Sequence, residues 1–202
     1  FFVRTVGWHD IIELTKDFGV SDFRAFNEQL VFRKDWVELH FGMECARCDL
    51  SFMTTVTNLD VHGLQGCVLT LPTNVVDFEL SHSKEVTVLG TENLDTLTVR
   101  DDSIKTALCP KLQELRWYGN TLSDETLPFP VHCLTTLSTM SVGVNRVDPA
   151  FRFPTQLTYL FLHVDREPVD VALLTPLTRL RSLYIETIKD QAPLDLSGLT
   201  AL

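Results

Sequence analysis

Hydrophobic residues recur along the chain at fixed offsets within a unit of about 20 residues. The first three apolar positions have offsets 0, 3 and 5, as in Leu112, Leu115 and Trp117. Within a unit, apolar and polar residues alternate, which predicts a short strand with one buried face. Because the unit repeats, we expect successive strands to stack in parallel as the coils of a solenoid. The first positions of the units are Trp36, Val56, Val75, Leu94, Leu112, Leu137, Leu157, Leu180 and Leu199.

A small polar residue stands at offset 8 of five consecutive units. Side chains of this kind can bond to backbone groups that are left unpaired where a strand ends. We therefore expect one such residue in the turn after each strand. Other units have Glu44, Leu64 and Ile188 at this offset and fit the pattern less well. The five residues that fit it are Ser83, Asp102, Asn120, Asn145 and Asp165.

This set of residues resembles the leucine-rich-repeat superfamily, whose pattern is L-x-x-L-x-L-x-x-N/C-x-L, over about residues 34 to 202. Prolines precede several predicted strands, at Pro72, Pro110, Pro154 and Pro176. Short, Pro-led units are similar to those of bacterial and protist members, whose convex side is extended rather than helical. The resemblance implies a leucine-rich-repeat solenoid of the α/β class, mostly β with few or short helices, and a curved parallel sheet on the concave face. The two longest units leave room for a helical turn near residues 170 to 174.

Residues 1–33 do not keep the repeat and are expected to form an N-terminal cap, mainly helical. The alternatives are a degenerate repeat at Val3, Val6 and Trp8, or the tail of a preceding domain. Residues 34–202 are expected to form a solenoid of about eight repeats, truncated inside a repeat at the C-terminus; we interpret the chain as a fragment. Two groups of apolar residues in the cap have the i, i+3, i+7 spacing of a helix: Ile11, Leu14 and Phe18, then Phe23, Phe26 and Leu30.

The charge and composition of the chain limit the kinds of binding partner that we expect. The net charge is −10, from 27 acidic and 17 basic residues, so we expect neither nucleic acid nor an anionic membrane as a partner. The longest apolar runs fall short of the roughly 18 residues of a membrane span. The five cysteines are odd in number and widely spaced, which favours reduced thiols and a cytoplasmic location.

The even offsets of each unit should point away from the core. Toward the N-terminal end they carry Glu38, Asp60, Asp77 and Glu79, which we interpret as a solvated acidic face, with docking of a basic partner as the alternative. Farther on, Tyr and Arg side chains gather, and these residue types are common at binding hot spots. The predicted partner-binding residues on the concave face are Arg100, Arg116, Tyr118, Tyr159, Phe161, His163 and Tyr184.

Two groups of residues could be drawn as metal sites. Cys45, Cys48, His62 and Cys67 include one close pair of ligands, whereas zinc fingers have two, so we expect buried or free thiols. His40, Asp60 and Glu79 share offset 4 with His62 nearby, and such donors can chelate a divalent ion. Acidic solenoid surfaces carry columns of this kind routinely, so we expect no metal and no cofactor.

The chain contains no P-loop, nucleophile elbow or zinc-protease motif, and nothing assembles a nucleophile, a base and an oxyanion donor. We therefore expect a non-catalytic protein-protein recognition module. One alternative is the substrate-recognition segment of a larger enzyme such as a ubiquitin ligase or a kinase. Another is a structural or adhesion repeat protein. The partner's identity and the oligomeric state cannot be derived from the sequence.

Overall fold

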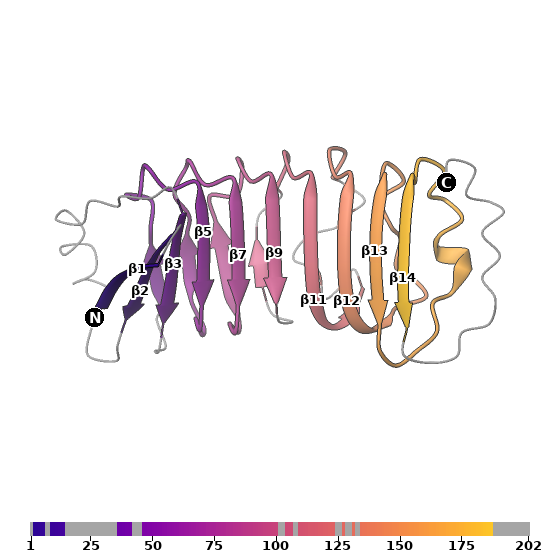
Figure 1. Cartoon of the computed structure of the whole chain (residues 1–202), viewed down its shortest axis with the longest axis horizontal. Coiled ribbons are helices and arrows are strands. Elements are labelled where there is room, and N and C mark those ends of the chain that lie inside the picture. The colour runs from indigo at the N-terminus through magenta and orange to yellow at the C-terminus, as the bar shows by residue number, and fades with distance from the viewer. Residues whose placement is uncertain are drawn as a thin grey trace.

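A computed structural model describes residues 2–6, 9–14, 36–41, 46–100, 104–106, 109–123, 127, 131 and 134–187. Over these residues the chain is mostly parallel β-structure with almost no helix, wound into a β-solenoid of about seven turns. Figure 1 shows the strands of the longer sheet side by side along the length of the molecule. No helix in the described ranges is long and apolar enough to cross a membrane.

The long sheet has ten strands in the order β1-β2-β3-β5-β7-β9-β11-β12-β13-β14. Every neighbouring pair is parallel except β1 and β2, which are antiparallel. The strands are β1 (Phe2–Val6), β2 (His9–Leu14), β3 (Trp36–Phe41), β5 (Asn58–His62), β7 (Asp77–Ser81), β9 (Thr96–Arg100), β11 (Glu114–Leu122), β12 (Thr139–Val147), β13 (Tyr159–Val164) and β14 (Ser182–Thr187).

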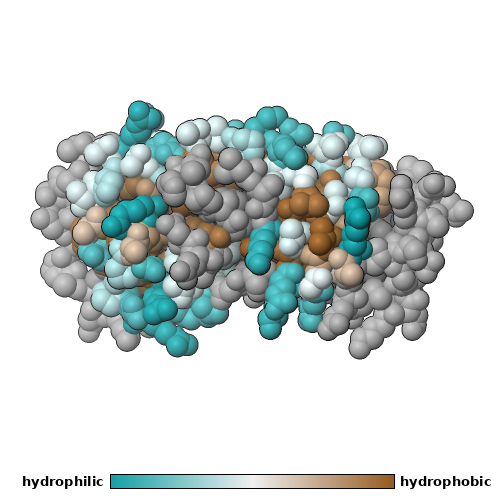
Figure 2. Space-filling model, turned by 180° about the vertical axis from the view of Figure 1, so that it is seen from behind, coloured by the Kyte–Doolittle hydropathy of each residue, from teal (hydrophilic) through white to brown (hydrophobic). Residues whose placement is uncertain are grey.

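A second, parallel sheet of four short strands alternates along the chain with strands of the long one. It contains β4 (Arg47–Asp49), β6 (Val68–Thr70), β8 (Val86–Leu89) and β10 (Ile104–Thr106). This extended conformation agrees with the expectation that this side of the coils is not helical. Seen from behind, the described surface mixes hydrophilic residues with smaller hydrophobic patches (Figure 2). One exposed apolar side chain of the second sheet is Leu89.

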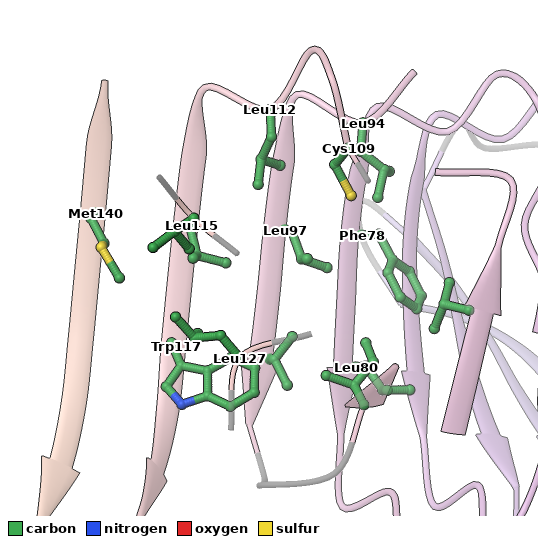
Figure 3. Close-up of a cluster of buried hydrophobic side chains, with 14 of the residues drawn as sticks. Phe78, Leu80, Leu94, Leu97, Cys109, Leu112, Leu115, Trp117, Leu127 and Met140 are labelled. Atoms are coloured by element: carbon green, nitrogen blue, oxygen red, sulfur yellow. The ribbon is translucent and has the colours of Figure 1, made fainter. Parts of the chain in front are cut away.

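The predicted apolar positions lie in the core, stacked in rows across successive strands of the long sheet, and residues of the second sheet and of the connections complete it. Strand pairing places Leu97, Leu115 and Met140 opposite one another at offset 3, and Val99, Trp117 and Val142 at offset 5. All six are at most 1% exposed. Figure 3 shows the inward side chains of neighbouring strands lying against one another, with Leu94 and Leu112 in the adjoining row. Each coil thus covers the apolar face of the next, as predicted.

A tight turn leads into most strands of the long sheet. The first apolar residue of the coil donates its N–H to the carbonyl three residues earlier, as from Val75 to Pro72 (3.2 Å) and from Leu157 to Pro154 (3.2 Å). Proline suits these turns because its fixed φ costs little there. The connection between β13 and β14 contains the predicted helical turn, the 3₁₀ helix η2 (Val171–Leu173), whose N-cap Asp170 accepts a bond from the Ala172 N–H (2.9 Å).

The register predicted for the first unit is wrong by two residues. Val37, not Leu39, lies opposite Leu59, and His40 lies opposite His62 rather than Asp60. Trp36 is therefore at the exposed edge of its strand rather than in the first core position. Side chains alternate with a period of two, so a slip of two residues left residues 38–41 on their predicted faces.

The helix predicted from Ile11 to Phe18 is also wrong as far as Leu14. His9–Leu14 form β2, which pairs in parallel with β3 and antiparallel with β1. Ile11 and Leu14 have helical spacing, but pairing with the neighbouring strand overrides this local preference. The second predicted helix, around Phe23 to Leu30, and the unit at Leu199 lie outside the described residues.

The polar residue at offset 8 makes the predicted turn contacts in one coil and different contacts in others. Ser83 is 7% exposed, accepts from the Leu64 N–H (3.1 Å) and donates to the Ser81 carbonyl (2.9 Å). Asn120 and Asn145 lie within β11 and β12, which continue past the predicted turn. There, Asn145 Nδ2 donates to Asn120 Oδ1 at 3.0 Å. Asp102 lies outside the described residues, and Asp165 contacts His163 Nε2 at 2.7 Å.

Two glycines near the end of β5 allow a test of the close packing between coils. Both have positive φ, +79° at Gly63 and +60° at Gly66. A Cβ at Gly63 would lie 2.2 Å from the Phe41 carbonyl oxygen, whereas one at Gly66 would meet nothing within 4 Å. Gly66→Ala should therefore cost about 1 kcal/mol of unfolding free energy for backbone strain alone. Gly63→Ala should cost at least about 2 kcal/mol more. Urea unfolding of both variants measures the difference, and equal losses would contradict this packing.

Candidate functional site

The outer face of the long sheet, meaning the face turned away from the core, carries the even-offset residues in three rows. The register between β11 and β14 confirms the predicted rows of this part of the face. One row contains Tyr118, Gly143, His163 and Glu186, and the next contains Arg116, Ser141, Phe161 and Tyr184. Within each row, residues on neighbouring strands are separated by the strand spacing of about 4.8 Å. The predicted partner-binding residues on these strands are therefore close neighbours in space.

Aromatic side chains dominate this part of the outer face. The Tyr159 and Tyr184 rings lie 5.8 Å apart with a tilt of 40°, and strand pairing places Phe161 opposite Tyr184. Tyr184 is 58% exposed, the most exposed of the large hydrophobic residues described. We call Tyr118, Tyr159, Phe161 and Tyr184 the aromatic patch. It offers rigid apolar surface to solvent.

Glycine at position 143 gives Tyr118 its place in the aromatic patch. A Cβ at Gly143 would lie 2.8 Å from Tyr118 Cδ1, so the ring rests directly on the glycine backbone. Arg100 packs on the same ring, its guanidinium carbon 4.7 Å from the ring centroid, as in a cation–π pair. The repeat pattern alone did not identify Gly143, because its importance depends on the side chain of a neighbouring strand.

Both predicted arginines already contact carboxylates. Arg100 Nε lies 2.7 Å from Glu79 Oε1, and Arg116 Nε lies 2.7 Å from Glu114 Oε1. The hydrogen bond to Glu114 raises the pKa of Arg116. His163 lies between Asp165 Oδ1 (2.7 Å) and Glu186 Oε2 (3.2 Å). Both arginines are thus paired internally, so that neither offers an unpaired positive charge beside the aromatic patch.

Two positions expected to be exposed are buried. Ser81 and Thr98 are each 2% exposed, although they lie at even offsets. The register places Thr98 between Glu79 and Arg116 on the flanking strands. Short side chains in such a position are covered by longer neighbours, which the sequence pattern does not reveal.

At the N-terminal part of the outer face, the structure brings together Glu38, His40 and His62. One ligand atom from each lies within 4.8 Å of the other two. His40 Nε2 is 2.5 Å and His62 Nε2 3.3 Å from Glu38 Oε1. The two imidazole rings stack with centroids 4.6 Å apart. Glu38 was not in the predicted metal-binding column, because the predicted register of β3 was shifted by two residues.

Asp60 is the most perturbed carboxyl group of the face. Burial raises its pKa to about 6, and the nearby carboxylates of Glu79, Glu38 and Asp77 act in the same direction. The hydrogen bond that Trp36 Nε1 donates to Asp60 Oδ2 (2.9 Å) acts in the opposite direction and lowers this pKa. The acidic face predicted from sequence is therefore partly buried, rather than fully solvated.

The cysteine arrangement considered as a zinc site is not assembled among the described residues. Cys48 and Cys67 are each 1% exposed and belong to the core. His62 belongs to the outer face of the long sheet, where its Nδ1 contacts Ser81 Oγ. The expectation of buried thiols is confirmed for these two residues, and Cys45 lies outside the described ranges.

Comparison of the chain with models of protein families, with curated proteins and with solved structures finds no match.

The raised pKa of Asp60 predicts a pH-dependent stability. The folded protein holds this proton more tightly than the unfolded chain, whose Asp has a pKa near 3.8. The resulting stabilisation is fully present below about pH 4 and is lost as the pH rises through 6. Asp60→Asn stays neutral and can still accept from Trp36. At pH 7.5 we expect it to be more stable than the parent by about 1–2 kcal/mol, allowing for solvent screening, with little difference at pH 4.

Urea unfolding at a series of pH values measures this difference. Asp95→Asn is the matched control, because it removes the same charge from an exposed position in a turn. A stability difference between the parent and Asp60→Asn that does not vary with pH would contradict the assignment.

Proposed function

We propose that this β-solenoid is of the leucine-rich-repeat type and acts as a non-catalytic module that binds a protein segment on the outer face of β11 to β14. The stacked apolar offsets and the extended second sheet support the repeat assignment. The observation that supports binding most directly is the aromatic patch, whose residues come from β11, β13 and β14 and which ends at the exposed Tyr184. A sheet face that only meets water has no need of such side chains.

The chemistry of the patch favours a particular kind of segment. Arg100 and Arg116 are paired with Glu79 and Glu114, so a strongly anionic segment would have to displace internal partners. Apolar or aromatic side chains of a bound segment can pack on Tyr159, Phe161 and Tyr184. The proposed partner is therefore a protein segment with apolar anchors and low net charge.

Rigidity of the face keeps the cost of binding low. The strands carrying the aromatic patch pair over at least six residues with each neighbour from β11 to β14. Their inward residues are buried in the core or, on β14, partly buried and packed against it. A preformed surface loses little conformational entropy when a partner docks. Binding would then depend on a few exposed side chains, rather than on rearrangement of the coils.

Removing the exposed aromatic rings should weaken binding without unfolding the protein. We expect Phe161→Ala combined with Tyr184→Ala to weaken affinity for a captured partner at least tenfold, as for hot-spot residues. The melting curve should change little, because Tyr184 is exposed and Phe161 only partly buried. Affinity capture with the parent and the variant, followed by titration of the enriched protein, measures the effect.

Leu89→Ala provides the matched control, because Leu89 is an exposed apolar residue of the second sheet. Gly143→Ala is an independent test of the aromatic patch, because its new Cβ would displace the Tyr118 ring without removing any aromatic side chain. The proposal would be refuted by unchanged affinity in the aromatic variant, or by an equal loss of affinity in Leu89→Ala.

A further inference from the structure

A second site lies on the outer face, away from the aromatic patch. We propose that Glu38, His40 and His62 bind a divalent transition-metal ion of the zinc type, which links β3 to β5. The backbone brings these side chains together without a loop: His40 and His62 are directly paired on neighbouring parallel strands, and Glu38 lies two residues before His40 on the same face. Because rigid strands hold all three, little order has to be gained on binding.

The donor set matches known metal chemistry. Two imidazoles and one carboxylate form a common set of protein ligands for Zn²⁺, with a further position left for water or another ligand. Imidazole favours Zn²⁺ and similar ions over Mg²⁺ or Ca²⁺. Bonds of about 2.0–2.2 Å in a tetrahedral arrangement place ligand atoms about 3.3–3.6 Å apart. Glu38 Oε1 and His62 Nε2 are already separated by 3.3 Å.

Binding requires a small rearrangement at His40. Its Nε2 lies 2.5 Å from Glu38 Oε1, a hydrogen-bond distance, and this separation must open by roughly 1 Å to admit an ion at the bond lengths above. The His40 side chain is 43% exposed, so it has room to turn, whereas those of Glu38 and His62 are each 20% exposed. Glu38 and His62 would therefore be the two well-packed ligands of the ion. His40 would turn toward the ion from the solvent side and become its third ligand.

The environment of His62 provides an independent indication of a ligand. Its Nε2 is buried and has no hydrogen-bond partner among the described residues, although buried polar atoms normally find one. Its other ring nitrogen contacts the Ser81 hydroxyl, and Ser81 is 2% exposed. Histidine ligands of metals are typically oriented by such a second contact, which directs the free nitrogen toward the ion. A metal ion would give Nε2 a bond that its 3.3 Å approach to Glu38 Oε1 does not provide.

Charge on the same face also favours a cation. Strand pairing aligns Glu38, Asp60 and Glu79 in one row across β3, β5 and β7. Arg100 contacts Glu79 at the far end of this row, and Trp36 donates to Asp60. A divalent ion beside Glu38 would reduce the repulsion among these carboxylates.

The test is a metal titration of untagged protein that has been treated with a chelator. Co²⁺ binding is followed by visible absorption, and Zn²⁺ binding by calorimetry. We expect one ion per chain at this site, with no thiolate-to-cobalt charge-transfer band. His40→Ala should lower Zn²⁺ affinity at least about 100-fold, and Ser81→Ala about 10-fold through loss of the orienting contact. His40→Ala is the decisive variant, because the His40 side chain is 43% exposed and its removal leaves the core intact.

His163→Ala is the matched control, since His163 also contacts two carboxylates but belongs to the other end of the face. Its Zn²⁺ affinity should equal that of the parent. No binding by the parent would overturn the proposal, as would unchanged affinity in His40→Ala or a cobalt spectrum showing thiolate ligation. The outcome is independent of partner binding, because the aromatic patch shares no residue with this site.

Discussion

The structure depends on each coil covering the apolar face of its neighbour. A single six-residue strand with three inward side chains cannot shield them from water. Pairing in parallel places Leu97 beside Leu115 and Met140, and Val99 beside Trp117 and Val142, so that all are buried. The backbone hydrogen bonds and the hydrophobic contacts therefore require the same register. Once that register is set, the alternation of side chains also decides which residues face solvent.

This dependence explains how much the sequence could predict. The apolar offsets predicted the inward rows from Leu59 to Ile185 and, apart from the buried Ser81 and Thr98, their solvent-facing counterparts, because both follow from a period of two. In the first unit, Trp36 stood at the expected Leu position and shifted the predicted register by two residues. Residues 38–41 kept their predicted faces, whereas Trp36 is exposed and His40 was misaligned. The extended second sheet and the turn near Asp170 followed from resemblance and unit length, respectively.

Other features depend on contacts between coils that a linear pattern does not contain. Ile11 and Leu14 have helical spacing, yet pairing with β3 makes their segment a strand. Asn120 and Asn145 bond to each other because β11 and β12 continue past the expected turn. The packing of the Tyr118 ring on Gly143, and the cluster of Glu38 with His40 and His62, likewise depend on contacts between neighbouring strands. The outer face thus has two chemically distinct ends on one scaffold, one aromatic and one rich in carboxylate and imidazole.

Cross-linking of introduced cysteine pairs tests the register most directly. Thr96 and Glu114 are directly opposite on β9 and β11, about 4.8 Å apart as in any parallel pair, which is within the range of a disulfide. Thr96 and Arg116 are offset by two residues, so their Cα atoms should be roughly 8 Å apart, beyond that range. After mild oxidation, the account predicts a disulfide in Thr96→Cys/Glu114→Cys and none in Thr96→Cys/Arg116→Cys. The reverse result, or a disulfide in neither pair, would contradict the in-register solenoid.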